Sequence, residues 1–333
     1  RSLFIRLDRI GDLVLSLPVD EGLGSVSVDW WIPQRLSFVT QASLPQRKAT
    51  EVAKQIGPGE FLRLLSLVRA QAYDSAVVFH APWWVGLLLF LARIPLRIGV
   101  QSQWHSFLFF NRGVRQKRSR ADKSELEFNY RLVEEGLGLA EGSLARRTLT
   151  LDAGDLDPLS KHGLRKGEYT VVHPGMGGSA RNWPVELYAD FARAQLKTGT
   201  VVVTGTASDG IYVRPLRELL ASEKNVVWLD EKLDGLELIS VLGNAKLVFA
   251  PSTGVLHLAA STGIPTLGLF SPVRVQRAVR WGPQGPRTAT LTPLVECPGE
   301  LRCLGEACPH WDCMPRVTLE EATEAAKAIS AAP

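Results

Sequence analysis

The sequence of 333 residues has no apolar run long enough to span a membrane, and it has no low-complexity tract or short-period repeat. Its longest apolar run, 83–91, is about half the length of a bilayer span. No cleavable apolar leader follows the strand-like segment 2–7. We therefore expect a globular protein of the cytoplasm with a buried helix at 83–91. The adjacent Trp83 and Trp84 also allow contact with a membrane surface.

The sequence also lacks a large excess of either positive or negative charge. The net charge is only +4, and the content of 45% hydrophobic and 22% charged residues excludes an intrinsically disordered chain. Residues 1–150 carry 20 Lys and Arg against 14 Asp and Glu, whereas residues 151–333 carry 18 against 20. This mild basic excess indicates an anionic partner for the first half. It is far from a nucleic-acid-binding stripe, so we expect no nucleic-acid partner.

Cysteine is rare and clustered. The only four lie within 17 positions, at Cys297, Cys303, Cys308 and Cys313. Their spacing matches no common zinc ribbon. A structural zinc ion, one or two disulfides and reduced thiols are all compatible with it, although long-lived disulfides are disfavoured in the cytoplasm. A catalytic role has little support.

Strands and helices alternate over short connections in the second half. We expect strands at 169–173, 200–204, 226–229, 246–250 and 265–270. This alternation is typical of a parallel sheet covered on both faces. A capping box at Thr318-Leu-Glu-Glu321 begins a C-terminal helix, which we expect to pack back across the first domain.

The first half opens in the same way, with a strand at 3–7, a loop at 8–12 and a helix at 13–17, whereas 20–50 shows no clear pattern. We predict an α/β fold of two Rossmann-like domains, 1–155 and 168–333, that face a central cleft. The prediction of a cleft follows because ligands of open parallel sheets bind at the carboxyl ends of the strands.

A strand near 248 runs into the turn Ser252-Thr253-Gly254 and then directly into a helix that carries His257. Ser252 or Thr253 can cap this helix, and Gly254 lets the backbone approach a ligand closely. The first amides of the helix carry partial positive charge, which suits a diphosphate. The turn alone is typical of any capped helix, but its combination with Gly254 and His257 favours phosphate binding.

A glycine-rich loop follows another strand, at His173-Pro-Gly-Met-Gly-Gly-Ser-Ala-Arg-Asn-Trp-Pro184. Gly175 and Ser179 offer backbone amides and a hydroxyl, and the guanidinium of Arg181 suits phosphate oxygens. We expect Trp183 to anchor the next helix and Pro184 to stand in its first turn. The glycines do not fit G-x-G-x-x-G, which argues against a nicotinamide enzyme.

The loop after the first strand carries two acidic residues, in Arg6-Leu-Asp-Arg-Ile-Gly-Asp12. Asp12 could accept a proton from an attacking hydroxyl, and Asp8 is the competing candidate. A capping role for Asp12 on the following helix is at least equally compatible with its position.

Taken together, the segments 10–18, 173–184 and 252–260 resemble the heptosyltransferase family of glycosyltransferases, glycosyltransferase family 9. The resemblance covers most of the second half, but only the opening and scattered pieces of the first. It implies a GT-B fold and an inverting, metal-independent transfer, usually of heptose from ADP-heptose, to a lipopolysaccharide-core or related glycan. No cofactor is then required for catalysis.

By this resemblance Asp12 corresponds to the general base of the family, and Arg181 to a Lys or Arg that meets the donor phosphates. Thr253, Gly254 and His257 correspond to the donor-binding turn.

Two positions depart from the family pattern. Ser252 stands where many members have Asp, and the acidic residue expected to contact the donor nucleoside has only Asp234 and Glu237 nearby. Both departures affect the identity of the donor more than the type of reaction.

Six basic residues lie within twelve positions: Arg112, Arg115, Lys117, Arg118, Arg120 and Lys123. Such a run is usually a solvated loop. The acceptor in the family, however, is a phosphorylated, lipid-linked oligosaccharide at an anionic membrane face, where each basic residue contributes about 1 kcal/mol. We therefore expect this run to bind the glycolipid or oligosaccharide acceptor, and the protein to lie peripherally on the cytoplasmic face of the inner membrane.

Two alternatives to glycosyl transfer stay open. One is a nucleotide-sugar epimerase or hydrolase with the same architecture. The other is a degenerate member of the family that binds nucleotide sugar or glycolipid without catalysis, a hypothesis that the two departures support.

Overall fold

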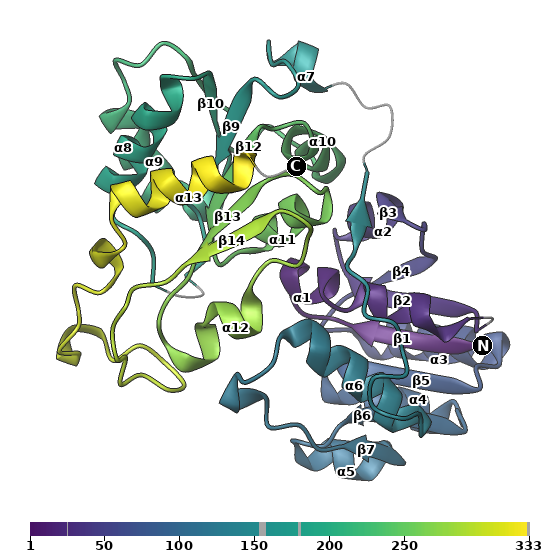
Figure 1. Ribbon diagram of the computed structural model, residues 1–333. Helices are drawn as coiled ribbons and strands as arrows, with labels where there is room; N and C mark the ends of the chain where they lie inside the picture. The colour runs from purple at the N-terminus through teal and green to yellow at the C-terminus, as the bar shows by residue number, and fades with distance from the viewer. Residues whose placement is uncertain (25, 153–157, 179–180, 332–333) are drawn as a thin grey trace. The chain divides into compact units, whose positions relative to one another are not determined.

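The computed structural model describes residues 1–24, 26–152, 158–178 and 181–331. The chain divides into two compact units, one of residues 1–118 and 125–149 and the other of residues 119–124 and 150–333. Each unit is built on a six-stranded parallel sheet with helices packed against it (Figure 1). The predicted α/β class with two parallel sheets is therefore confirmed.

The first sheet has the strand order β4-β2-β1-β5-β6-β7. Its strands are β1 (Ser2–Arg6), β2 (Val28–Pro33), β4 (Ala49–Val52), β5 (Ser75–His80), β6 (Leu96–Val100) and β7 (Arg112–Val114). All neighbouring pairs are parallel. The direction of winding reverses between β1 and β5, so the carboxyl ends of these two strands form the switch point of the sheet, where ligands of such sheets bind.

The central strand β1 is buried on both faces because helices cover both sides of the sheet. Leu3 and Ile5 join a core with residues of the helices on one face. Phe4 points to the opposite face of the sheet and packs edge-on against Trp30, with ring centroids 5.3 Å apart.

The remaining elements of the first unit are α1 (Ile10–Val14), η1 (Leu17–Leu23), α2 (Ser37–Gln41), β3 (Ser43–Leu44), α3 (Pro58–Gln71), α4 (Trp83–Leu91), α5 (Trp104–Phe109) and α6 (Glu125–Leu137).

The second sheet repeats this topology in the order β11-β10-β9-β12-β13-β14. Its parallel strands are β9 (Tyr169–Val172), β10 (Thr200–Val203), β11 (Val226–Trp228), β12 (Leu247–Pro251), β13 (Thr266–Leu269) and β14 (Thr288–Leu291). Here the winding reverses between β9 and β12. The predicted loops after 173 and 251 therefore leave from the switch point of the sheet.

The helices of the second unit pack around an aromatic core. They are α7 (Pro158–Lys161), α8 (Val185–Leu196), α9 (Gly210–Leu219), α10 (Gly235–Gly243), α11 (Gly254–Ser261), α12 (Ala278–Trp281) and α13 (Leu319–Ala331). Trp183 is buried between Tyr188 and Phe249, and its indole N–H donates to the Val317 carbonyl over 2.9 Å. It is the anchor that we predicted.

Helix α13 begins at the predicted capping box, in which the Glu321 amide donates to the Thr318 hydroxyl over 3.2 Å and the Thr318 amide donates to the Glu321 carboxylate over 2.8 Å. Its buried Ala322 and Ala326 pack into the core of the second unit, and the helix lies against α8, β13 and β14. The small apolar face of α13 thus matches its own sheet.

Two helix starts also differ from the prediction. Helix α1 begins at Ile10 rather than Leu13, so Asp12 lies inside its first turn and Arg9 is the N-cap. Pro184 is the N-cap of α8 and not a residue of its first turn. Among the described residues, the structure has no helix that is both long and apolar enough to cross a membrane.

Candidate active site

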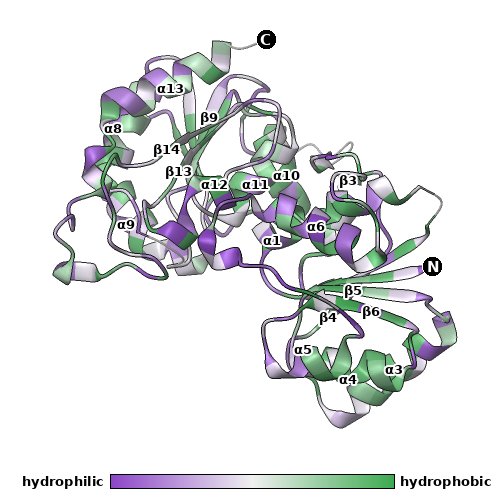
Figure 2. Cartoon of the chain, turned by 60° about the horizontal axis from the view of Figure 1, so that its bottom comes forward, coloured by the Kyte–Doolittle hydropathy of each residue, from purple (hydrophilic) through white to green (hydrophobic). Residues whose placement is uncertain are grey.

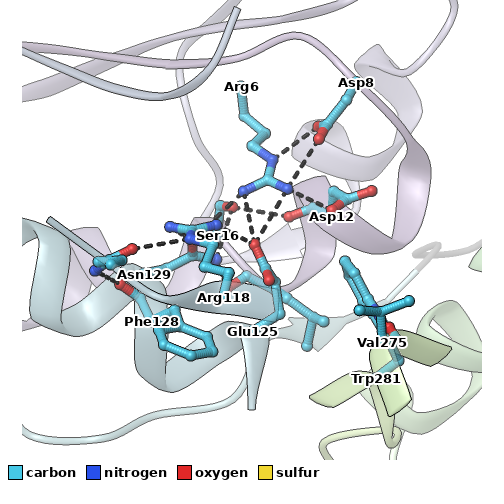
Figure 3. A network of polar contacts seen from close by, with 12 residues as sticks. Arg6, Asp8, Asp12, Ser16, Arg118, Glu125, Phe128, Asn129, Val275 and Trp281 are labelled. Atoms are coloured by element: carbon cyan, nitrogen blue, oxygen red, sulfur yellow. Dashed lines mark hydrogen bonds and ion pairs between the residues drawn. The ribbon is translucent and has the colours of Figure 1, made fainter. Parts of the chain in front are cut away.

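A cluster of charged side chains fills the carboxyl end of β1, at the switch point of the first sheet (Figure 3). Arg6, the last residue of β1, is buried. Its Nε lies 2.7 Å from Asp8 Oδ1 and its Nη2 2.9 Å from Asp8 Oδ2, which is a two-pronged ion pair. The same Nη2 also donates to Asp12 Oδ1. One buried guanidinium therefore holds both acidic residues of the loop.

Glu125, the first residue of α6, closes the cluster from the other side. Its Oε1 accepts from Arg6 Nη1 over 3.3 Å and also from Arg118 Nη1. Arg118 is further held by Gln116 Oε1, 2.8 Å from its Nε. A buried carboxylate between two guanidinium groups gains from both hydrogen bonds and charge.

Asn129, one turn further along α6, fixes the position of α1. Its side-chain amide donates to the Leu15 carbonyl over 2.9 Å and to the Ser16 hydroxyl over 3.1 Å. The Ser16 hydroxyl in turn donates to the Asp12 carbonyl over 2.8 Å. The backbone that carries Asp12 is thus tied to α6, although α1 itself is a single short helix.

Burial raises the pKa of the Asp12 carboxyl to about 6. Arg6 opposes this shift, and the negative charges of Asp8 and Glu125 add to it. The three carboxylates of Asp8, Asp12 and Glu125 surround Arg6, and Arg118 adds a second guanidinium group at Glu125. A carboxylate with a pKa near 6 is largely ionised at neutral pH and accepts a proton more readily than an ordinary Asp, as a general base requires.

The sequence interpretation found Asp12 and Asp8 but missed Arg6, Glu125 and Asn129. A signal existed in the buried strand, which ends in an Arg with two acidic residues directly after it. The i, i+4 spacing of Glu125 and Asn129 also places both on one face of α6. The capping role of Asp12 was wrong, because Arg9 takes the cap position and the Asp12 side chain turns to Arg6.

The donor-site candidates of the second unit lie at the ends of β9 and β12. His173 is buried directly after β9 with its Nδ1 3.0 Å from the Thr204 hydroxyl, and burial lowers its pKa to about 4. Thr253 is the N-cap of α11, and its side chain makes no capping hydrogen bond. The Ser252 amide donates to the Leu269 carbonyl over 3.0 Å, which ties the turn to the next strand.

His257 lies in α11, one turn after Gly254, and is buried. Burial lowers its pKa to about 4, so the ring is neutral at physiological pH. Among the described residues its buried Nδ1 has no hydrogen-bond partner. A buried polar atom left unpaired is unfavourable by roughly 1–3 kcal/mol, which a ligand would relieve.

The glycine-rich loop divides into residues with different surroundings. A Cβ at Gly175 would overlap the Asp209 carboxylate, which accepts from the Thr206 amide over 2.8 Å. Gly177 and Gly178 have φ of 55° and 71°, in the left-handed region that glycine tolerates. Ser179 lies outside the described residues.

Arg181, which follows this loop, contacts the cysteine-rich segment. Its guanidinium lies over the ring of Trp311, 3.4 Å from the centroid, and its buried Nη1 has no hydrogen-bond partner among the described residues. A charged group held by stacking, with donors still unused, is suited to receive an anion. Arg181 also lines a cavity with His310 and all four cysteines, Cys297, Cys303, Cys308 and Cys313.

The four thiols are free. Within the described ranges, no group of three or more His, Cys, Asp or Glu side chains is arranged to hold a metal ion. Backbone amides donate to two of the sulfurs, from Gly305 to Cys303 and from His310 to Cys308, each over 3.4 Å.

The basic run is not one uniform loop. Arg112 begins β7, and Arg112, Arg115 and Lys117 are exposed. Arg118 instead belongs to the Asp12 cluster, whereas Arg120 is exposed within the segment 119–124 of the second unit.

Asp234 and Glu237 form a reciprocal capping box at the start of α10, with hydrogen bonds of 2.8 and 3.0 Å. Glu237 also lies 3.1 Å from Lys161 Nζ. These contacts show a local role for both side chains, which the sequence analysis had named only as the acidic residues nearest to the expected position.

The chain matches the model of glycosyltransferase family 9 (heptosyltransferase) over residues 61–297. Lipooligosaccharide heptosyltransferase 2 of Haemophilus influenzae is 26% identical over 286 residues, which cover 78% of this chain and 77% of that protein. The structure of E. coli ADP-heptose lipopolysaccharide heptosyltransferase II has a TM-score of 0.79 at 18% identity, with 99% and 98% of the two chains covered. An E. coli heptosyltransferase solved with ADP has a TM-score of 0.74 at 16% identity, with 99% of each chain covered.

The two sheets and these structural similarities define a GT-B fold. The match extends over more than half of the chain. The protein belongs to glycosyltransferase family 9 and is a heptosyltransferase-like glycosyltransferase.

Proposed function

We propose that this protein is an inverting glycosyltransferase that moves heptose from ADP-heptose onto a lipopolysaccharide-core or related glycan acceptor, with Asp12 as the general base. The observation that carries the proposal is the Asp12 carboxylate at the switch point of the first sheet, bound to Arg6 and with a pKa raised to about 6. ADP-heptose as donor is supported by the names of the related heptosyltransferases.

The reaction is a single displacement. The acceptor hydroxyl gives its proton to Asp12 while its oxygen forms a bond to the anomeric carbon of the sugar. The bond from that carbon to the diphosphate breaks, and ADP leaves with the electron pair. Attack from the face opposite to the leaving group inverts the anomeric configuration. The rate gain comes from groups aligned before the reaction.

The donor diphosphate binds at the switch point of the second sheet in this proposal. Arg181 supplies a positive charge with an unused Nη1. The amides at the start of α11, from Gly254 onward, supply partial positive charge. His257 offers its unpaired Nδ1, and Thr253 its hydroxyl. These groups offset the developing charge on ADP, so the proposed transfer needs no divalent metal.

The two halves take separate roles. Residues 1–155 form the acceptor-binding domain and residues 168–333 the donor-binding domain, with Gly175, Ser179 and Ser252 contributing to the donor loops. The exposed Arg112, Arg115, Lys117 and Arg120 attract the anionic acceptor, and Arg118 aligns the Asp12 cluster. The protein works in the cytoplasm, at the inner face of the inner membrane.

Asp12→Asn is the decisive variant, because it keeps the size of the side chain but cannot accept the proton. We expect transfer from ADP-heptose, measured as released ADP and glycosylated acceptor, to fall by roughly 10²–10⁴. Stabilisation of the protein by ADP, measured by thermal shift, should persist. Transfer at the wild-type rate by this variant would disprove the assignment of the base, and ADP release without acceptor would favour a hydrolase.

Arg181→Ala tests the donor site with a panel of ADP, UDP, GDP, CMP and their sugars. The wild type should be stabilised by ADP and ADP-heptose, and the variant should lose most of this stabilisation. Arg165→Ala, a substitution at an exposed position of the second unit, is the matched control. Stabilisation by another nucleotide would change the donor, and stabilisation by none would favour a member of the family that does not catalyse transfer.

A structural zinc ion at Cys297, Cys303, Cys308 and Cys313 is a separate proposal. It rests on four thiols around one cavity and on the backbone amides directed at two of the sulfurs, and it requires these side chains to move closer together, because no three of them are placed to hold a metal ion in the described arrangement. We expect about one equivalent of zinc in the purified protein, lost in Cys303→Ser with Cys308→Ser. A metal-free wild type with four titratable thiols would reject the zinc site and leave the proposed transfer untouched.

A further inference from the structure

Helix α5 turns its apolar side toward solvent. Trp104, Phe107 and Leu108 lie at positions i, i+3 and i+4 and are 66%, 53% and 63% exposed, whereas Ser106 of the same helix is buried. An ordinary surface helix does the opposite, because burial of apolar area is what holds it to the core. The outward face of α5 is therefore not explained by the packing of its own unit.

Helix α4 presents a second apolar stripe beside it. Trp83, Phe90 and Leu91 are exposed on one side of the helix, while Trp84, Val85, Leu88 and Leu89 are buried on the other. The two adjacent tryptophans thus have different roles. Trp84 donates to the Lys54 carbonyl over 2.9 Å inside the unit, and only Trp83 points outward.

The two helices form one continuous surface. Gly86 of α4 allows the close approach of Phe109, since a Cβ there would lie 3.0 Å from the Phe109 Cβ. The rings of Phe90 and Phe109 are 6.2 Å apart. Arg97 joins them, with its guanidinium 5.5 Å from the Phe90 centroid and its Nε 2.8 Å from the Phe109 carbonyl. Figure 2 shows α4 as largely hydrophobic, with α5 next to it. We call the six residues Trp83, Phe90, Leu91, Trp104, Phe107 and Leu108 the aromatic face.

The chain segment that contains the aromatic face carries charge of one sign only. From Ser75 to Ala121 the sequence has six Arg and one Lys, and neither Asp nor Glu. Arg93 is exposed directly after α4, and Arg112 and Arg115 are exposed after α5. Apolar aromatic side chains with a basic surround fit an anionic bilayer, in which Trp occupies the headgroup region and Arg meets phosphate.

We propose that the aromatic face docks the protein on an anionic lipid bilayer. A second copy of the chain fits less well, because symmetric pairing of this face would bring the positive charges of segment 75–121 of both copies together. The docking proposal rests on the proposed function, because a lipid-linked acceptor would lie at a membrane and the enzyme must reach it there. Docking on α4 and α5 then supplies a contact separate from the Asp12 cluster.

Sedimentation with vesicles tests the docking face in the full-length chain. We expect the wild type to bind vesicles of phosphatidylethanolamine and phosphatidylglycerol and to bind phosphatidylcholine vesicles much less. Phe107→Ser with Leu108→Ser should lower the partition coefficient roughly tenfold or more, because two apolar side chains no longer enter the interface. Ile211→Ser is the matched control, since Ile211 is 71% exposed on α9, and it should bind as the wild type does.

Transfer onto a deacylated, water-soluble acceptor separates this proposal from the proposed function. The double variant should transfer to this acceptor at the wild-type rate and melt at nearly the wild-type temperature. Wild-type protein that transfers but ignores anionic vesicles would overturn the docking proposal alone. Vesicle binding without transfer would overturn only the proposed function. A wild-type dimer that the double variant converts to monomers, without vesicle binding in either, would make the face a self-interface and end the lipid proposal.

Discussion

Glu125→Gln changes the charge of the Asp12 cluster without removing a side chain. Glu125 is buried and raises the pKa of Asp12 by repulsion, while its Oε1 accepts from Arg6 and Arg118. Asp12 and Glu125 both contact Arg6 Nη2, so their charges are close together, and two unit charges about 6 Å apart at an effective dielectric constant of about 20 interact by roughly 3 kcal/mol. The amide oxygen introduced by Glu125→Gln can still accept from Arg6 and Arg118, whose positive charges then act on Asp12 without the opposing charge of Glu125. A fall in the pKa of Asp12 by about one unit, equivalent to about 1.4 kcal/mol, is therefore a conservative expectation.

The acid limb of kcat/KM for glycosyl transfer reports this pKa, because Asp12 must be ionised to act as a base. The midpoint near pH 6 in the wild type should move to about pH 5 in Glu125→Gln. Glu127→Gln is the matched control on α6, since Glu127 binds Arg146 away from the cluster, and its limb should not move. An acid limb that stays in place or moves to higher pH in Glu125→Gln would refute the electrostatic reasoning.

Three further predictions concern stability. The pKa of Asp12 in the folded protein lies above the usual 3.8, so its negative charge destabilises the fold above about pH 4. Asp12→Asn should therefore raise the melting temperature at pH 8 by a few degrees, as measured by calorimetry, although the variant loses transfer activity. The buried side chains of His173 and His257 have pKa values of about 4, below their usual value. The free energy of unfolding should therefore fall as the pH drops from about 6.5 toward 4. Urea titrations that show a constant free energy of unfolding over this range would contradict this prediction. Trp183→Ala should cost about 3–5 kcal/mol in urea unfolding, whereas Leu294→Ala, at a fully exposed position, should stay within about 0.5 kcal/mol, and equal losses would contradict the assigned core.

The second sheet was predictable because its strands are short, apolar and separated by helices, so the sequence pattern of each segment indicates a buried strand and nothing else. Residues 20–50 were not, because β2 mixes the buried Asp29 with Trp30 and Trp31. Asp29 is accommodated by partners distant in sequence, since its Oδ2 accepts from the Tyr73 hydroxyl over 2.7 Å. No local pattern contains that information, and the strand is recognisable only once the partner is known.

The candidate residues Asp12, Arg181 and His257 could be named from the sequence because each follows closely after a predicted strand and has a side chain suited to the chemistry. The site was not predictable where the partner comes from another part of the chain. Arg118 looked like one member of a basic run, but its ion pair with Glu125 removes it from that run. Trp311 was not considered a functional residue, yet it positions the Arg181 guanidinium. Both corrections depend on tertiary contacts that a charge count does not contain.

Asp8 and Asp12 were rival bases in the sequence, and their contacts divide the roles. Both oxygens of Asp8 are bound by Arg6, so its carboxylate is committed to holding the guanidinium. Asp12 uses Oδ1 for the same guanidinium, and its other oxygen is the one that can take a proton. Asp8 is therefore best understood as the residue that fixes Arg6, and Arg6 as the residue that fixes the base.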